Sequence, residues 1–147
     1  MTEQLSIGHK LAHNIGLIVL ASQELEKNLK LVVAASGDEA SSLTDRLRKL
    51  ERRALGEVVA RFLGNVTVTE GSLADLETYF SRLLDRRNKV VHHFFETYGA
   101  DLEAGRHKEV LASLGALCGE LRNIERTFRT VNEAWLEILQ QDLMPEG

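Results

Sequence analysis

The chain has 147 residues, 44% of them hydrophobic, and a formal net charge of −4. The length fits one domain over residues 1–147, and the acidic balance argues against a protein whose whole surface neutralises nucleic-acid phosphates. A single cysteine, Cys118, excludes an intramolecular disulfide, and the longest apolar patch is too short to span a bilayer. We therefore expect a cytoplasmic protein without membrane contact.

The composition favours helices. Leu, Val, Ala, Glu and Arg are abundant, and the single proline, Pro145, lies next to the end of the sequence. The first predicted helix runs from about Leu5 to Ala35, with apolar residues at alternating spacings of four and three, and it ends at the Ser-Gly-Asp sequence 36–38. This periodicity is typical of a long bundle helix.

Two further helices follow in the middle of the chain. One is predicted from Ser42 to Leu63, with Gly64 and Asn65 closing it. Residues 66–69, Val-Thr-Val-Thr, have strand propensity but no partner strand, so we interpret them as an extended loop. The next helix begins after Ser72, a predicted N-cap residue, and continues to about residues 98–99.

The last predicted helix is the longest. Its apolar residues alternate at spacings of four and three: Val110, Leu114, Leu117, Leu121, Ile124, Phe128, Val131, Trp135 and Ile138. Such a series predicts a buried stripe that includes Trp135, with a coiled coil to another chain as the alternative. Together the four segments predict an all-α fold, an antiparallel four-helix up-down bundle with a long C-terminal helix.

The third predicted helix carries a basic run at residues 86–93, Arg-Arg-Asn-Lys-Val-Val-His-His. Arg87 occupies a position in its apolar stripe, between Leu83 and Val90. Burying an unpaired guanidinium is costly, so such an arginine reaches solvent, pairs with an acid, or lines a site for an anion. The sequence leaves these three alternatives open.

This run resembles the signature of the HEPN family, the higher eukaryote and prokaryote nucleotide-binding domains. The family's hallmark is an arginine, four to six residues, and then a histidine. Residues 87–92, Arg-Asn-Lys-Val-Val-His, match it with four intervening residues and with the polar residue that commonly follows the arginine. The chain length and the number of predicted helices are also similar to those of the family.

The resemblance implies a metal-independent endoribonuclease that acts as a homodimer. His92 would transfer protons, Arg87 would hold the phosphate, and Asn88 would orient the imidazole or a phosphate oxygen. On an ideal helix Arg87 and His92 lie about 140° apart, so one copy alone makes a poor site. Two copies of this helix, facing each other, would bring both arginines and both histidines into one cleft.

Four neighbouring side chains are candidates for substrate binding. A basic rim around the cleft is predicted from Arg82, Arg86 and Lys89, and His93, beside His92, either supports the site or points outward. The alternative is an ion-pair network in which Asp85 or Glu96 neutralises an arginine or His92.

Two classes of function follow. The first is an endoribonuclease with an RNA substrate, as the toxin of a toxin-antitoxin or defence pair restrained by an antitoxin. The second is a non-catalytic HEPN-like module that binds a nucleotide, RNA or a partner such as a nucleotidyltransferase, and a structural bundle without a ligand is a third alternative. We predict no cofactor and no metal, because His9 and His13 lack the glutamate that completes a zinc-protease pattern.

Overall fold

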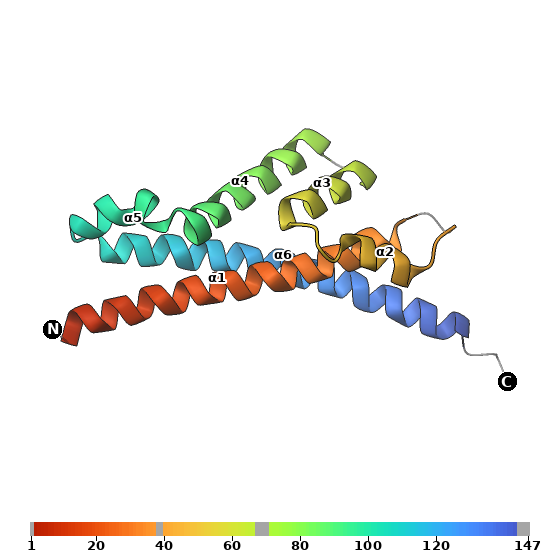
Figure 1. The fold of residues 1–147 in the computed structure, drawn as a ribbon, viewed down its shortest axis with the longest axis horizontal. Helices are drawn as coiled ribbons and strands as arrows, with labels where there is room; N and C mark the ends of the chain where they lie inside the picture. The colour runs from red at the N-terminus through yellow and green to blue at the C-terminus, as the bar shows by residue number, and fades with distance from the viewer. Residues whose placement is uncertain (1, 38–39, 67–70, 144–147) are drawn as a thin grey trace. The chain divides into compact units, whose positions relative to one another are not determined.

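The computed structural model describes residues 2–37, 40–66 and 71–143, with the side chains of 6–37, 40–66 and 71–141. This part of the chain is built of helices joined by short turns (Figure 1), which confirms the all-α prediction. The helices are α1 (Thr2–Ala35), α2 (Leu43–Leu50), α3 (Leu55–Asn65), α4 (Leu73–His92), α5 (Phe94–Glu103) and α6 (His107–Leu143). The loop predicted at residues 66–69 lies outside the described residues except for Val66, which is extended.

The chain divides into two compact units. Unit 1 comprises Met1–Gln23 and Val68–Arg122, and unit 2 comprises Glu24–Thr67 and Asn123–Gly147. Both α1 and α6 therefore contribute to each unit. That residues 1–147 form a single domain remains a prediction, because two compact units that share α1 and α6 do not test it.

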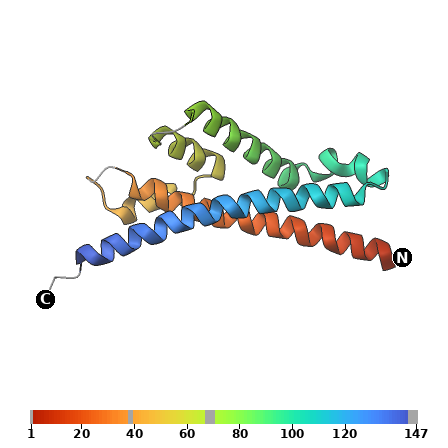
Figure 2. The same ribbon diagram turned by 180° about the vertical axis from the view of Figure 1, so that it is seen from behind.

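Unit 1 contains the basic run. Within it, α4 and α5 run opposite to α6, because Arg86 pairs with Glu120 whereas Tyr98 meets Ser113. The parts of α1 and α6 in this unit run side by side in the same direction (Figures 1 and 2), unlike the first and last helices of an up-down bundle. The buried side chains of this unit are Ile18, Ala21, Ser22, Phe80, Leu83, Val90, Val110, Leu114, Leu117, Cys118 and Leu121.

Unit 2 combines an apolar core with buried polar groups. Its buried apolar side chains are Leu25, Leu29, Val33, Ala34, Leu50, Leu55, Val58, Val59 and Phe128. The ring of Phe128 meets that of Phe62 edge to face, with centroids 5.0 Å apart. The amide of Asn28 donates to Glu125 Oε1 at 3.2 Å, and the amide of Asn132 donates to the backbone oxygen of Asn28 at 3.0 Å. These bonds fix the register of α1 against α6 within this unit.

The second predicted helix is two helices, so its prediction as one segment was wrong. A turn after Leu50 separates α2 from α3, and it lets both Leu50 and Leu55 be buried. The side chain of Lys30 donates to the backbone oxygen of Glu51 at 3.0 Å, which satisfies a carbonyl at the end of α2. Residues 51–54, which form this break, include no proline or glycine.

The third predicted helix is also interrupted. His93, with φ −134° and ψ 35°, separates α4 from α5 and leaves His92 as the last residue of α4. The bend brings the Tyr98 hydroxyl to within 3.5 Å of the Ser113 hydroxyl of α6. Gly105, with φ +78°, then provides the left-handed turn before α6, a conformation that side chains other than glycine rarely adopt.

The apolar stripe of α6 is buried along only part of its length. Phe128 is 8% exposed, but Val131, Trp135 and Ile138 are 41%, 43% and 52% exposed. The prediction that Trp135 lies in the core was therefore wrong. Spacing determines which side chains share a helix face, but it does not determine where the neighbouring helices end.

Replacing Gly37 by alanine is expected to destabilise unit 2. A Cβ at Gly37 would lie 2.6 Å from Cδ of Arg46, whose guanidinium donates to the backbone oxygens of Ala34 and Ser41. Losing a charge-assisted hydrogen bond costs about 1.5–3 kcal/mol, more than the 0.4–1 kcal/mol or so that a Gly→Ala change gains in chain entropy. We expect a net loss of about 1 kcal/mol in urea unfolding.

The matched control is Gly16→Ala in α1, where an added Cβ meets no atom within 4 Å. Because alanine is the better helix former, this variant should be as stable as the parent or more so. Equal stability of the Gly37→Ala variant and the parent would contradict the close approach of Arg46.

Candidate functional site

The candidate site is built on α4. Ser72 begins the helix as predicted, with its hydroxyl accepting a hydrogen bond from the backbone N–H of Ala74 at 3.1 Å. Phe80, Leu83 and Val90 are buried and hold one face of the helix against the rest of unit 1. This packing fixes the rotation of α4, and hence the direction of every residue in the basic run.

Arg87 lies at the edge of the buried face, as the apolar stripe predicted. Its side chain is partly buried, and its Nη1 donates to Asn88 Oδ1 at 2.9 Å. Its Nε is shielded from solvent and has no hydrogen-bond partner among the described residues. An unpaired, buried donor on a permanently charged group is costly, and an incoming anion would satisfy it.

Asn88 and His92 are both exposed and lie one helical turn apart. The ring of His92 lies 6.5 Å from that of His93, and His93 Nδ1 lies 3.3 Å from Glu96 Oε2. Glu96 therefore pairs with His93, and no described acid forms an ion pair with His92. A free, solvent-facing imidazole at the end of a helix is accessible to a substrate.

The three candidate catalytic residues do not converge within one copy. Asn88 binds Arg87, but five positions along a helix separate Arg87 from His92, which places their side chains about 140° apart around α4. The described chain thus presents Asn88 and His92 on one side of the helix, about 40° apart, and Arg87 on another, joined to the Asn88 amide by a hydrogen bond.

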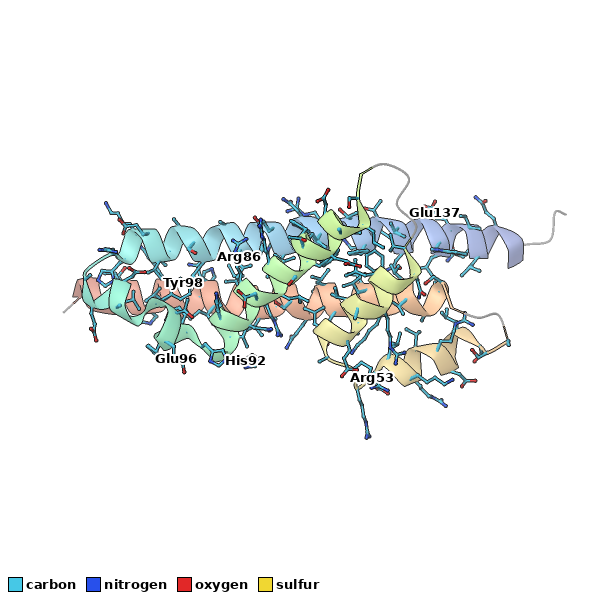
Figure 3. All side chains as sticks on the ribbon, turned by 90° about the horizontal axis from the view of Figure 1, so that it is seen from above. Arg53, Arg86, His92, Glu96, Tyr98 and Glu137 are labelled. Carbon is cyan, nitrogen blue, oxygen red and sulfur yellow. The ribbon has the colours of Figure 1, made fainter. Side chains whose placement is uncertain are left out.

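Three of the four predicted substrate-binding residues form a stripe of α4. Arg82, Arg86 and Lys89 follow one another at spacings of four and three, so they share a helix face, whereas His93 lies just beyond the last residue of α4 and has non-helical dihedral angles. Arg86 Nη1 lies 2.6 Å from Glu120 Oε2, and Lys89 Nζ lies 3.0 Å from Asp85 Oδ2. Figure 3 shows Arg86 on the side of α4 toward α6, with His92 and Glu96 on the opposite side.

The acids therefore neutralise most of the predicted rim. Arg86, Lys89 and His93 each face a carboxylate, whereas Arg82 is exposed and forms no ion pair with a described residue. The Lys89–Asp85 and His93–Glu96 pairs are exposed, and exposed ion pairs are worth about 0–1 kcal/mol, so a phosphate can displace these two acids at small cost.

Tyr79 and Glu120 belong to the surroundings of this stripe and were absent from the sequence-based site. Burial raises the pKa of the Tyr79 phenol above its usual 10.0, Glu120 raises it further, and Arg86 lowers it. Tyr79 lies seven residues before Arg86 and so shares its helix face, a spacing from which its membership of the site could have been predicted. Glu120 lies 34 residues away from Arg86, so no local spacing predicts that the two side chains meet.

The variant Glu120→Gln is expected to lower the pKa of Tyr79. It removes a negative charge that disfavours the phenolate and frees the Arg86 cation, which favours it. Because the folded chain favours the neutral phenol, this contribution to stability is present below pH 10 and is lost as the pH rises through the folded pKa. Ultraviolet titration of the parent and of a Tyr79→Phe reference measures the shift, and an unchanged or higher pKa would contradict the described cluster.

No group of three or more histidine, cysteine, aspartate or glutamate side chains within the described residues is arranged to hold a metal ion. His9 and His13 are both exposed on α1. Among the described helices none combines the length and apolarity needed to cross a bilayer.

Comparison with known proteins gives a partial similarity to an enzyme. No protein-family model matches the chain, and no solved structure does. The chain is 23% identical over 129 residues to the processive diacylglycerol beta-glucosyltransferase of Bacillus subtilis (strain 168), an alignment that covers 84% of this chain. The same alignment covers 33% of the glucosyltransferase, so the chain spans about a third of that relative's length.

Proposed function

We propose that the protein is a metal-independent endoribonuclease of HEPN type, acting as a homodimer. The observation that carries the proposal is Arg87, whose partly buried guanidinium has an unpaired Nε and binds Asn88, in the same helix as the free imidazole of His92. These are the three positions of the HEPN-like motif.

The reaction is attack of a ribose 2′-hydroxyl on the adjacent phosphate. It needs a group that accepts and donates protons near neutral pH, which an imidazole can do, and a cation that stabilises charge on the phosphoryl oxygens. His92 has the first role and Arg87 the second, with Asn88 holding the guanidinium in place. The products are a 2′,3′-cyclic phosphate and a 5′-hydroxyl.

The homodimer follows from the angular separation of Arg87 and His92. A phosphate bound to Arg87 of one copy is about 140° around α4 from the same copy's imidazole. A second copy of α4, related by a two-fold axis, supplies its His92 to that phosphate and receives the first copy's His92 in return. In this arrangement each phosphate meets an arginine and a histidine from different copies of a HEPN-type helical bundle.

A second candidate function is a non-catalytic HEPN-like module. The observation that favours it is the pairing of Arg86 with Glu120 and of Lys89 with Asp85, and the contact of His93 with Glu96. Such a surface suits a nucleotide, RNA end or protein partner such as a nucleotidyltransferase more than rapid capture of long RNA. This function needs Arg87 for binding but no proton transfer by His92.

Controlled expression in a bacterial host separates the two functions. The ribonuclease predicts growth arrest and fragmented total RNA with the parent, and neither with His92→Ala at equal soluble protein. An antitoxin that restrains the parent would extend the proposal to a toxin-antitoxin or defence pair. Healthy cultures with intact RNA in both cases would favour the binding module.

A further inference from the structure

Unit 2 contains a pocket that the proposed ribonuclease does not use. Its volume is about 390 Å³, within the range of small-molecule sites. It is formed by the end of α1, the second half of α2 and the last turns of α3. All of its lining residues belong to unit 2, whereas the HEPN-like motif belongs to unit 1.

Positive charge dominates the described lining of this pocket. Three of its residues are the cations Arg46, Lys49 and Arg61, and none of the described lining residues is acidic. Lys49 and Arg61 are exposed and form no ion pair with a described residue, unlike Lys30, which contacts Glu26 at 3.8 Å in the same unit. Two cations that lack acidic partners and face one pocket attract an anion.

Arg46 binds backbone carbonyl groups at the edge of this pocket. Its guanidinium donates to the backbone oxygens of Ala34 and Ser41, which satisfies a carbonyl at the C-terminal end of α1. It thereby offsets the partial negative charge of that helix end. The charges of Lys49 and Arg61 remain available to a ligand.

The other lining residues are apolar side chains, one amide side chain and two glycines. Val33, Ala34 and Leu50 form an apolar wall, and Asn65 adds an amide at the end of α3. Gly64 lines the same pocket, and a Cβ added there would meet no atom within 4 Å. A ligand that uses the whole lining therefore has an anionic end and an apolar body.

We propose that this pocket binds a small organic phosphate, with its phosphate between Lys49 and Arg61 and its apolar part against the wall formed by Val33, Ala34 and Leu50. A doubly charged phosphate uses both cations, which a single carboxylate does less well. The apolar wall gives an organic phosphate an advantage over inorganic phosphate. The inference is independent of the ribonuclease, since the two sites share no residue.

The test is a titration of the isotope-labelled chain with adenosine 5′-monophosphate, followed by amide chemical shifts. Adenosine and inorganic phosphate serve as parallel probes. We expect saturable shifts centred on Gly37, Lys49, Gly64 and Asn65, with the monophosphate binding more tightly than either probe. The same titration on Arg87→Ala should give the same affinity, because that variant removes only the proposed ribonuclease site.

Two variants and a control complete the experiment. Removing both cations, in Lys49→Ala with Arg61→Ala, should lower the affinity at least about tenfold. Gly64→Leu should also lower it, by filling the pocket without a change of charge. The control, Arg48→Ala with Arg52→Ala, removes two exposed cations outside the lining and should bind as the parent does.

Three results would overturn the proposal. One is the absence of saturable binding by the monophosphate, or binding no tighter than that of adenosine. Another is unchanged affinity in both the two-cation variant and Gly64→Leu. The third is tighter binding of a 5′-phosphorylated oligoribonucleotide than of the monophosphate, which would assign the pocket to an RNA end.

Discussion

Replacing His92 by alanine is expected to abolish RNA cleavage while the helices and their stability stay unchanged. His92 is exposed at the last position of α4 and forms no ion pair with a described residue, so its removal costs little folding energy. Loss of a general acid or base lowers a rate by roughly 10²–10⁴-fold. Cleavage of a labelled RNA without divalent metal, beside a urea unfolding curve, measures both quantities.

Two controls make this prediction specific. His13→Ala removes another exposed histidine, on α1, and should cleave RNA as the parent does. Arg87→Ala should lose activity as well, because it removes the phosphate-binding cation, whereas Arg87→Lys should recover only part of it, since lysine lacks the planar fork. Full activity of His92→Ala would remove the imidazole from the mechanism.

Replacing Leu114 by alanine is expected to destabilise the fold by about 2–5 kcal/mol, the range for large-to-small changes in a packed core. Leu114 is 0% exposed on α6, in the core of unit 1. The change removes buried apolar atoms and leaves a cavity that neighbouring helices fill only in part. Urea unfolding monitored by circular dichroism measures the difference.

The matched control is Leu20→Ala on α1. Leu20 also belongs to unit 1, but it is 60% exposed, so the same chemical change should alter stability by less than about 0.5 kcal/mol. Similar losses in the two variants would contradict the described orientation of α1 or α6.

Periodicity predicted the helical class and most of the buried faces. Val110, Leu114, Leu117 and Leu121 are buried on α6, as the spacings indicated. Apolar spacing reports the face that a helix presents to its neighbours, and this information is local.

Apolar spacing did not predict where the helices break or which side chains their neighbours leave exposed. The bend at His93 and the turn after Leu50 contain no proline or glycine, so the sequence has no helix-breaking residue at either place. The exposure of Trp135 depends on where neighbouring helices end, which its own spacing does not encode.

The sequence predicted which residues belong to the candidate site better than it predicted which residues they contact. Arg87 lies at the edge of the buried face, as its place in the stripe indicated. Arg86 pairs with Glu120, which lies 34 residues further along the chain, so no local sequence pattern predicts this contact. The angular separation of Arg87 and His92, in contrast, follows from helix geometry alone.

The measurement that tests the central claim most directly is a mixing experiment with Arg87→Ala and His92→Ala. Each purified variant alone should leave a labelled RNA uncleaved. After the two are mixed and allowed to exchange subunits, the mixed dimer contains one intact site with an arginine from one copy and a histidine from the other, and we expect part of the parent's activity to return. No recovery in mixed dimers, beside an active parent, would contradict a site shared between copies, and an inactive parent would contradict the ribonuclease itself.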